Sequence, residues 1–343
     1  MTKHINLALQ GGGSHGAYAW GVLDKLLEDG RLKVDGMCGT SAGAMNAAVY
    51  AYGYFKGQAD GAREALEKFW RRISDAGAIY SPLHSPFHAN SIQGLPGGEW
   101  LLQATYSAFD AMTRTFSPYQ FNPFNMNPLR DVLQESVNFD EINDANSVKL
   151  FICATSVRDG KPRIFRNDEV TVDSVLASAC LPYLFQAVEI GGEAYWDGGY
   201  IGNPALYPLI YETETLDVLI IHVNPIVRNE VPKRADEIMN RINEISFNSS
   251  LVREMRAIGF VQKLVADGWL KDEHADRLKV LYIHAIRSDA ELARYGAQTK
   301  LRTDWEFLTE LRDLGRAQAG RWLEENYDAV GNRQTVDIRA DYL

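Results

Sequence analysis

The sequence predicts an α/β protein with a mainly parallel central sheet and helices on both faces of that sheet. Short apolar runs of strand length alternate along the chain with segments of helical periodicity, and strands joined by helices are parallel. The runs at residues 5–9 and 216–223 are strongly apolar, as expected of strands inside such a sheet. A chain of 343 residues suffices for one large domain with an appendage, or for two domains.

The elements before residue 81 repeat a strand–turn–helix order. The expected elements are a strand at 5–9, a glycine-rich turn at 11–16, a helix at 17–27, a short strand ending at 37–38, a helix at 42–55 and an amphipathic helix at 61–73. Residues 36–55 carry no charge, but they are rich in Gly, Ala, Ser and Asn rather than in Leu, Ile and Phe. We therefore expect a buried helix there and not a membrane span.

Residues 81–129 interrupt this alternation. The segment holds six prolines and many aromatic residues, and its stretches 82–98 and 115–129 contain no Asp, Glu, Lys or Arg. It is too long and too apolar for an ordinary connection. We interpret it as an insert, either a cover over an apolar site or a segment that packs on the core or forms a dimer contact.

Regular alternation resumes after the insert. The expected elements are a strand at 150–155, a helix at 172–180, a short strand at 194–196, a helix at 205–211, strands at 216–223 and 280–286 with a helix at 236–265 between them, and a long C-terminal helix at 305–322. In the helix at 236–265, one apolar face is predicted from the spacing of Ile238, Ile242, Ile245, Val252 and Met255.

Composition and charge exclude several classes of protein. Hydrophobic residues make up 46% and charged residues 23%, as in soluble globular proteins. The net charge of -10 argues against a nucleic-acid partner and against electrostatic docking on anionic lipid. Cys38, Cys153 and Cys180 form no disulfide or zinc pattern, which indicates a reducing compartment. With no signal peptide apparent, we expect a cytoplasmic protein without a metal or other cofactor.

Gly39-Thr40-Ser41-Ala42-Gly43 is a G-x-S-x-G pentapeptide between a predicted strand and a predicted helix. In hydrolases this motif holds a nucleophilic serine on a strained turn, and its glycines make the turn without a Cβ clash. Several strands and helices precede this turn in ordinary α/β-hydrolases, whereas only one strand, one helix and a short second strand fit before Ser41. The motif therefore indicates a different hydrolase architecture or a coincidence.

A second glycine cluster supports two interpretations. Gly11, Gly13 and Gly16 match the G-x-G-x-x-G fingerprint of dinucleotide binding, and Asp35 follows about twenty residues later. In a dinucleotide site, however, the acidic residue ends the second strand, and here the pentapeptide occupies that place. Loops after successive parallel strands share one edge of the sheet, so the two glycine motifs should face each other. The loop is then an oxyanion site for Ser41, built from backbone amides at a helix N-terminus.

Ser41 also needs a base, and a carboxylate fits better than any histidine. His222 and His284 lie within apolar strands, as satisfied core residues do, and His15 is the one histidine whose position in the sequence places it near Ser41. Asp197 instead ends a short strand before Gly198-Gly199, in a segment with no other charge up to residue 211. Desolvation would raise the pKa of Asp197 and make it a better proton acceptor.

These motifs resemble those of the patatin-like phospholipase family. That family combines a G-G-G-x-[RK]-G loop, a G-x-S-x-G turn and a downstream D-G-[GA] motif. Here they read Gly11-Gly12-Gly13-Ser14-His15-Gly16, Gly39-Thr40-Ser41-Ala42-Gly43 and Asp197-Gly198-Gly199. The stretch 177–185 is similar to the family's A-S-x-[SA]-x-P-x-x-F block, and Asn203-Pro204 falls where the family often has the same pair.

The resemblance implies a three-layer sandwich that hydrolyses lipid acyl esters. It assigns Ser41 as nucleophile, Asp197 as base and the amides of Gly11, Gly12 and Gly13 as oxyanion hole. It places a catalytic domain at residues 5–211, and residues 212–343 then complete the sheet and add a helical extension. His15 departs from the family pattern of Arg or Lys, and activity would depend on pH near neutrality if His15 carried charge.

The sequence thus favours a serine-dependent lipid acyl hydrolase whose insert forms a lid or an acyl-chain wall. Partners expected beyond the lipid ester are a peripheral contact with a membrane or a second copy of the chain. An acyltransferase with the same dyad is the main alternative, although enzymes of the malonyl-transferring type usually carry His where this chain has Thr40. A dinucleotide-binding oxidoreductase and a silent lipid-binding module fit fewer of the motifs.

Overall fold

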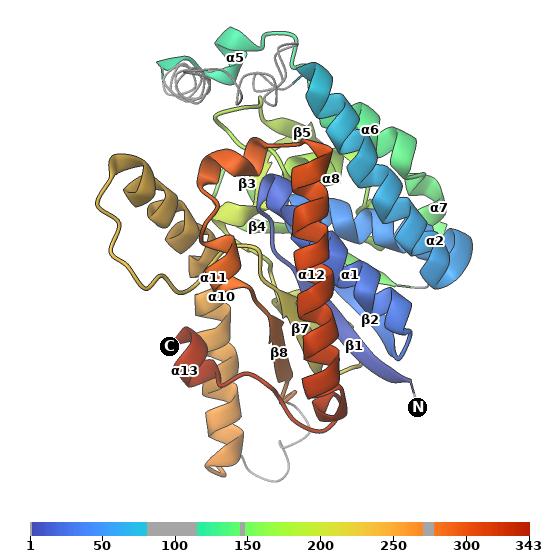
Figure 1. The fold of residues 1–343 in the computed structure, drawn as a ribbon, viewed down its shortest axis with the longest axis vertical. Helices are drawn as coiled ribbons and strands as arrows, with labels where there is room; N and C mark the ends of the chain where they lie inside the picture. Colours follow the sequence, from blue (N-terminus) through green and yellow to red (C-terminus); the bar gives the residue numbers. More distant parts are fainter. Residues whose placement is uncertain (1, 81–114, 145–147, 270–277) are drawn as a thin grey trace.

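The computed structural model describes residues 2–80, 115–144, 148–269 and 278–343 of the chain (Figure 1). The part of the predicted insert at residues 81–114 lies outside the described residues. The described chain forms a mixed α/β fold around one sheet with helices on both faces, which confirms the predicted fold class. In the described part of the chain, no helix is long and apolar enough to cross a membrane.

The strands of the sheet follow the order β5-β6-β3-β2-β1-β7-β8, with β4 paired to β3. The β3–β2, β2–β1, β1–β7 and β7–β8 pairs are parallel, whereas β4, β5 and β6 pair antiparallel. The strand bounds are β1 Lys3–Leu9, β2 Leu32–Gly39, β3 Lys149–Ser156, β4 Pro162–Arg166, β5 Val188–Ile190, β6 Glu193–Asp197, β7 Asp217–Ile221 and β8 Tyr282–Ile286. The parallel centre is therefore flanked on one side by antiparallel strands, and β6 brings Asp197 to that side.

Helices cover both faces of the sheet. The α-helices are α1 Gly16–Asp29, α2 Ala42–Tyr80, α5 Pro118–Phe121, α6 Pro128–Ser136, α7 Phe139–Asp144, α8 Val172–Ser178, α9 Tyr207–Glu212, α10 Ala235–Ala266, α11 Asp289–Leu292, α12 Trp305–Asn326 and α13 Ile338–Tyr342. The short 3₁₀ turns are η1 Gly13–His15, η2 Asn167–Glu169, η3 Gly198–Tyr200, η5 Ala297–Leu301 and η6 Tyr327–Ala329. The predicted helices and strands at the centre of the fold are all present, with bounds shifted by a few residues.

Alternate residues of the central strands face two different cores. Leu7 and Leu9 of β1 pack with α1, α2, α8 and α12, whereas Ala8 packs with α9, α10 and α13 on the opposite face. This alternation follows from the period of two in a strand, and both faces are apolar because both are covered. β7 and β8 extend the sheet beyond β1, so the C-terminal part of the chain takes part in the same cores.

Two elements differ from the prediction in informative ways. The helices predicted at 42–55 and 61–73 are joined as α2, with a kink where Gly57 and Gln58 leave helical geometry. The apolar face predicted for residues 236–265 is only half buried: Met255 is enclosed, but Ile238, Ile242 and Ile245 are 41%, 49% and 54% exposed. The helical spacing of apolar residues was recognised correctly, but spacing alone does not reveal where a partner surface ends.

Helix α12 lies directly on α1, the helix that follows the glycine loop (Figure 1). The two helices approach closely because each carries a glycine at the contact. A Cβ at Gly21 would overlap the carbonyl of Arg312, and a Cβ at Gly315 would overlap the carbonyl of Tyr18. The C-terminal segment is therefore held against the N-terminal half of the site by backbone-to-backbone contact.

This contact predicts opposite effects for two Gly→Ala changes on α12. Gly315→Ala should lower the free energy of unfolding by about 1–3 kcal/mol or more, because the helices must move apart. Gly320→Ala meets only the end of the Lys25 side chain at 3.8 Å and should be neutral or stabilising by up to about 1 kcal/mol. Chemical denaturation of both variants checks this, and equal effects would contradict the close contact.

Candidate active site

Ser41 lies on a strained turn between β2 and α2. Its φ of 55° is in the left-handed region, which is unfavourable for a residue with a Cβ. The turn is possible because the flanking glycines leave room: a Cβ at Gly39 would lie 2.5 Å from the carbonyl oxygen of Gly43, and a Cβ at Gly43 would overlap the carbonyl of Leu9. The pentapeptide therefore forms the turn predicted for a nucleophilic serine.

The glycine loop after β1 packs against this turn. A Cβ at Gly11 would lie 2.6 Å from the Cβ of Ser41 and 2.7 Å from the carbonyl oxygen of Thr40. The last glycine of the loop, Gly16, makes room for Ala42 at the start of α2. β1 and β2 are parallel neighbours, so their following loops meet at one edge of the sheet, as predicted.

Hydrogen bonds fix the loop and leave two of its amides unused. The Gly11 amide donates to Oδ1 of Asn203 at 2.7 Å, and the Gly11 carbonyl accepts from the Asn224 side chain at 2.8 Å. No hydrogen bond engages the amides of Gly12 and Gly13 within the described ranges. Gly11 belongs to the predicted oxyanion hole; in this structure its amide is bonded to Asn203, and its lack of a Cβ allows the close approach of Ser41.

Asp197 reaches the same edge from the antiparallel side of the sheet. It ends β6, where it pairs with Ala154 of β3, and its backbone amide donates to the carbonyl of Cys180 at 2.8 Å. Thr155 Oγ1 donates to the carbonyl of Asp197 at 2.8 Å. A Cβ at Gly198 would overlap the carbonyl of Cys153, so the glycine lets the turn pass close over β3.

The carboxylate of Asp197 is completely buried and only half satisfied. Its Oδ1 accepts from the Gly199 amide at 2.7 Å, but its Oδ2 has no hydrogen-bond partner among the described residues. Burial raises the pKa of Asp197 to about 7, although the Gly199 amide, the Ser41 hydroxyl and Lys300 each lower it. The carboxylate is therefore a stronger base than an exposed aspartate, and Ser41 is among the groups near enough to influence its pKa.

Ser178 links the serine turn to β3. Its hydroxyl accepts from the Ser41 amide at 2.9 Å and donates to the carbonyl of Cys153 at 2.6 Å. The neighbouring Thr40 donates its hydroxyl to the carbonyl of Gly202 at 2.6 Å. The sequence placed Ser178 in a family-like block without a role, and the structure shows that it supports the turn of Ser41.

The histidines considered as possible bases for Ser41, namely His15, His222 and His284, are all buried. His15 is buried, its Nε2 lies 2.7 Å from Thr299 Oγ1, and burial together with Lys300 lowers its pKa to about 3. It is therefore neutral near pH 7, and the pH dependence expected if His15 carried charge does not arise from this residue. His222 and His284 are buried core residues, bonded to Tyr342 and Asp217 respectively, although Nδ1 of His222 has no hydrogen-bond partner among the described residues. His84 and His88 lie outside the described residues.

Asp35, the acidic residue on which the dinucleotide-binding interpretation depends, lies away from the glycine loop. Asp35 lies within β2 rather than before it, since the strand is longer than predicted. Its carboxylate accepts from His4 Nδ1 at 2.6 Å, near the start of the parallel strands and away from the glycine loop. In the ranges that the structure describes, no group of three or more His, Cys, Asp or Glu side chains could hold a metal ion.

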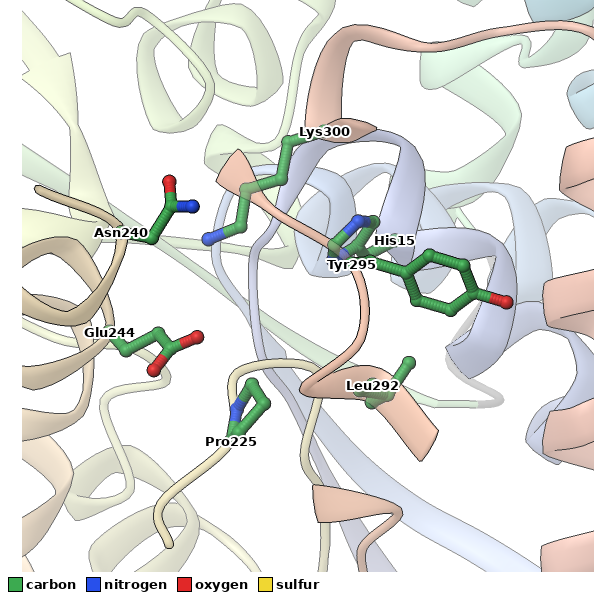
Figure 2. Close-up of a pocket in the computed structure, with 7 residues that line it drawn as sticks. All are labelled: His15, Pro225, Asn240, Glu244, Leu292, Tyr295 and Lys300. Atoms are coloured by element: carbon green, nitrogen blue, oxygen red, sulfur yellow. The ribbon is translucent and has the colours of Figure 1, made fainter. Parts of the chain in front are cut away.

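The C-terminal segment closes one side of the site, which sequence reasoning missed. Figure 2 shows a small pocket beside the glycine loop, between α10 and the segment that carries Tyr295 and Lys300. The carbonyl of Lys300 abuts Gly13, whose φ of 59° is left-handed, and a Cβ there would overlap it. Thr299 and Lys300 carried no motif, so only the three-dimensional contact could reveal them.

One comparison with known proteins agrees with the motifs. The family model of patatin-like phospholipases matches residues 7–210. No curated protein sequence matches the chain significantly. VipD from Legionella pneumophila is similar in structure over 94% of this chain and 67% of its own, with 17% identity and a TM-score of 0.42. ExoU of the Pseudomonas aeruginosa type III secretion system, solved with SpcU, is similar over 94% of this chain, with 16% identity and a TM-score of 0.32, and the chain spans 53% of its length.

The raised pKa of Asp197 predicts that Asp197→Asn stabilises the protein in a pH-dependent manner. Between the ordinary pKa of 3.8 and the folded value of about 7, the unfolded chain loses this proton and the folded chain keeps it. The wild type therefore loses stability as the pH rises through this window, and the asparagine variant does not. The difference in free energy of unfolding should be near zero at pH 4 and about 1–4 kcal/mol at pH 8.

Chemical denaturation at both pH values measures this difference. Asp168→Asn, at an exposed position, controls for the change in net charge. A difference between Asp197→Asn and wild type that is equal at pH 4 and pH 8 would contradict a raised pKa.

Proposed function

The chain belongs to the patatin-like phospholipase family, and we propose that it hydrolyses carboxylic esters of lipids through a Ser41–Asp197 dyad. The observation that carries this proposal is the carboxylate of Asp197. It is fully buried, its Oδ2 has no hydrogen-bond partner among the described residues, and the hydroxyl of Ser41 is near enough to lower its pKa. A buried acid of this kind serves stability poorly, and it suits a base that must accept a proton from a neighbouring hydroxyl.

The first half of the reaction forms an acyl-enzyme. Ser41 Oγ attacks the ester carbonyl carbon while its proton passes to Oδ2 of Asp197, which gives a tetrahedral intermediate with a negative oxygen. The amides of Gly12 and Gly13 donate to that oxygen, at the N-terminal side of α1, where the helix dipole also favours negative charge. The carbon–oxygen bond of the ester then breaks, and the proton on Asp197 passes to the departing alcohol.

The second half releases the acid. A water molecule attacks the acyl carbon, and Asp197 takes its proton. The new tetrahedral intermediate collapses, the bond to Ser41 Oγ breaks, and the proton returns from Asp197 to the serine. The fatty acid leaves, and the dyad is restored without a histidine, since one carboxylate with a pKa near neutrality can both accept and donate the proton.

An apolar surface beside the site fits a lipid substrate. Exposed aromatic and methionine side chains lie on two segments, 116–126 and the loop before β5: Phe116, Tyr119, Phe124, Met126 and Tyr183. The segments are joined where the Ala187 amide donates to the Tyr119 hydroxyl and where Gln186 donates to the carbonyl of Asn122. The loop starts at Cys180, whose carbonyl holds the Asp197 amide. We propose that this surface meets the lipid aggregate.

Transfer of the acyl group to another acceptor would use the same dyad. The acyl-enzyme is common to both reactions, and they differ only in whether water or an alcohol or thiol attacks it. Product analysis with added glycerol or a thiol distinguishes them. Free fatty acid as the main product supports hydrolysis, and acylated acceptor as the main product would replace it by transfer.

Substitution of either dyad residue should impair ester hydrolysis, and each for a different reason. Ser41→Ala should lose both ester hydrolysis and covalent labelling by a fluorophosphonate probe, because the attacking oxygen is gone. Asp197→Asn should lose about 10²–10⁴-fold in kcat, because general-base assistance is removed while the hydroxyl remains. Ser249→Ala, on the surface of α10, is the matched control and should behave as wild type. Wild-type protein that cleaves no ester and takes no label would overturn the proposal.

Removal of apolar side chains from the proposed lipid surface should affect aggregated substrate only. Phe124 and Met126 are 87% and 58% exposed, so Phe124→Ser combined with Met126→Ser leaves the core unchanged. Hydrolysis of phosphatidylcholine vesicles should fall about tenfold or more, because burial of an aromatic side chain in lipid contributes about 2 kcal/mol. Hydrolysis of a soluble short-chain ester should not change.

Trp269→Ser provides the control for this test. Trp269 is 73% exposed and follows the end of α10. It lies roughly 30 Å along the helix from Phe247, the residue of α10 that packs on Gly199. An equal loss of vesicle hydrolysis in both proteins would show that the apolar surface at 116–126 has no special part in lipid contact.

A further inference from the structure

The glycine loop holds no cation of its own. His15 is its one titratable side chain, and the ring is neutral near pH 7 because its pKa is about 3. The ring packs against Tyr295 at 5.8 Å and Phe307 at 6.2 Å between centroids. Negative charge nevertheless collects beside this loop, first on Asp197 and then on the oxyanion. The source of positive charge must therefore lie elsewhere in the fold.

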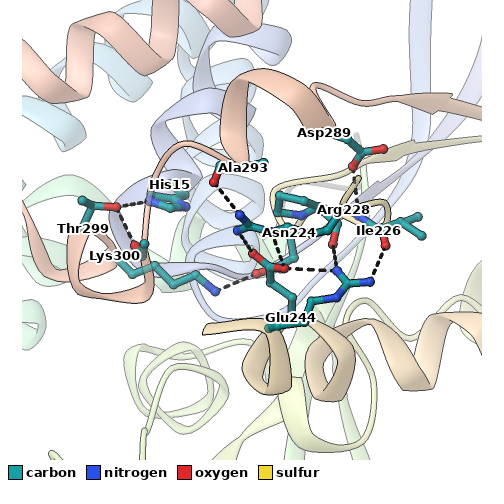
Figure 3. A network of polar contacts seen from close by, with 12 residues as sticks. His15, Asn224, Ile226, Arg228, Glu244, Asp289, Ala293, Thr299 and Lys300 are labelled. Atoms are coloured by element: carbon teal, nitrogen blue, oxygen red, sulfur yellow. Dashed lines mark hydrogen bonds and ion pairs between the residues drawn. The ribbon is translucent and has the colours of Figure 1, made fainter. Parts of the chain in front are cut away.

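Lys300 brings an ammonium group to the loop from the far end of the chain. It belongs to η5, which crosses the loop so that the Lys300 carbonyl abuts Gly13. Its Nζ donates to Oδ1 of Asn224 at 2.7 Å, and Nδ2 of the same asparagine donates to the Gly11 carbonyl at 2.8 Å. Figure 3 shows this contact between Lys300 and Asn224 beside His15. Lys300 thus contacts the glycine loop directly at Gly13 and, through Asn224, at Gly11.

A second contact leads from Lys300 to the turn of Asp197. Its Nζ lies 5.4 Å from the ring centroid of Phe247 on α10, within cation–π range. Phe247 in turn packs on Gly199, where an added Cβ would lie 2.8 Å from Cδ1 of the ring. Gly199 is the residue whose amide binds the Asp197 carboxylate. Lys300 therefore touches the supports of both the oxyanion loop and the base.

The charge of Lys300 is not neutralised by a carboxylate in the described ranges. Glu244 of α10 lines the same pocket as Lys300, and its charge acts on the Lys300 ammonium (Figure 2). It is already held by Arg228 and Arg241, the latter at 3.1 Å. Burial lowers the pKa of Lys300 to about 8, whereas Glu244 and Asp197 raise it, so the ammonium form persists at neutral pH. Three further titratable groups lie near enough to Asp197 to be affected by its charge. Burial, together with that charge, raises the pKa of Cys153, Cys180 and Tyr200.

We propose that Lys300 is a positioning residue that supplies the positive charge of the active site, through the Asn224–Gly11 contact and the field that it exerts on Asp197. This inference rests on the proposed ester hydrolysis. It extends the functional site beyond residues 7–210, because a residue of the C-terminal extension completes it. It also gives a reason for the close contact of α12 with α1, which places the segment before α12 over the loop.

Four full-length variants test this proposal. Lys300→Met removes charge and hydrogen bond, Lys300→Gln keeps a donor for Asn224, and Lys300→Arg keeps the charge. Lys279→Met is the control, since Lys279 is an exposed lysine whose ammonium donates to the carbonyl of Thr213, far from the site. The readout is the rate at which a fluorophosphonate probe labels Ser41, measured from pH 5 to pH 10, with thermal unfolding as a check of the fold.

We expect Lys300→Met and Lys300→Gln to label about ten- to a hundredfold more slowly at neutral pH, by analogy with the loss of one oxyanion donor. The acidic limb of their pH profiles should move to higher pH, because a positive charge that lowers the pKa of Asp197 is gone. Lys300→Arg should retain most of the wild-type rate and its acidic limb. Lys279→Met should match wild type.

Each other outcome overturns a defined part of the account. If Lys300→Gln labels like wild type while Lys300→Met does not, the hydrogen bond matters and the charge does not, so the proposal fails. Equal rates and profiles in all four variants overturn it as well. Wild-type protein that does not label at Ser41 overturns the proposed function itself.

Discussion

The site depends on one unfavourable arrangement: a fully buried carboxylate, one of whose oxygens has no hydrogen-bond partner in the described chain. Asp197 is placed there by the pairing of β6 with β3 and by a turn in which Gly198 passes over the carbonyl of Cys153. Isolated, such a group would reduce the stability of the fold. Beside a serine hydroxyl, the same desolvation makes the carboxylate basic enough to take a proton near neutral pH. The proposed chemistry and the cost in stability therefore have the same physical cause.

The second constraint is that backbones must approach each other without side chains between them. Gly11 lies against Ser41, Gly39 against Gly43, and Gly13 against Lys300, and a Cβ at any of these glycines would overlap its neighbour. These contacts bring three loops from β1, β2 and the C-terminal segment to one edge of the sheet. The parallel order of the central strands makes this convergence possible, because their following loops all lie at that edge. In the proposed reaction, the amides of Gly12 and Gly13 then serve as the oxyanion site without any rearrangement of the loop.

The motifs allowed much of this to be predicted from sequence, because each motif is local. The turn at Ser41, the glycine loop and Asp197 before two glycines are short stretches whose geometry depends on their own residues. Contacts between distant segments could not be predicted. These are the hydrogen bonds of Gly11 with Asn203 and Asn224, of Ser41 with Ser178, and of Lys300 with Asn224. The neutrality of His15 also follows only from its burial. On α10, periodicity identified an apolar face but not the point at which its packing partner ends.

A crystal structure of the protein after reaction with a fluorophosphonate would test the central claim most directly. The account predicts phosphorus bonded to Ser41 Oγ, with one phosphonyl oxygen accepting from the amides of Gly12 and Gly13. It also predicts Oδ2 of Asp197 within hydrogen-bond reach of Ser41 Oγ or of a water beside it, with His15 still bonded to Thr299. An adduct oxygen directed away from the glycine loop, or a histidine ring in contact with Ser41 Oγ, would contradict a dyad built on a buried carboxylate.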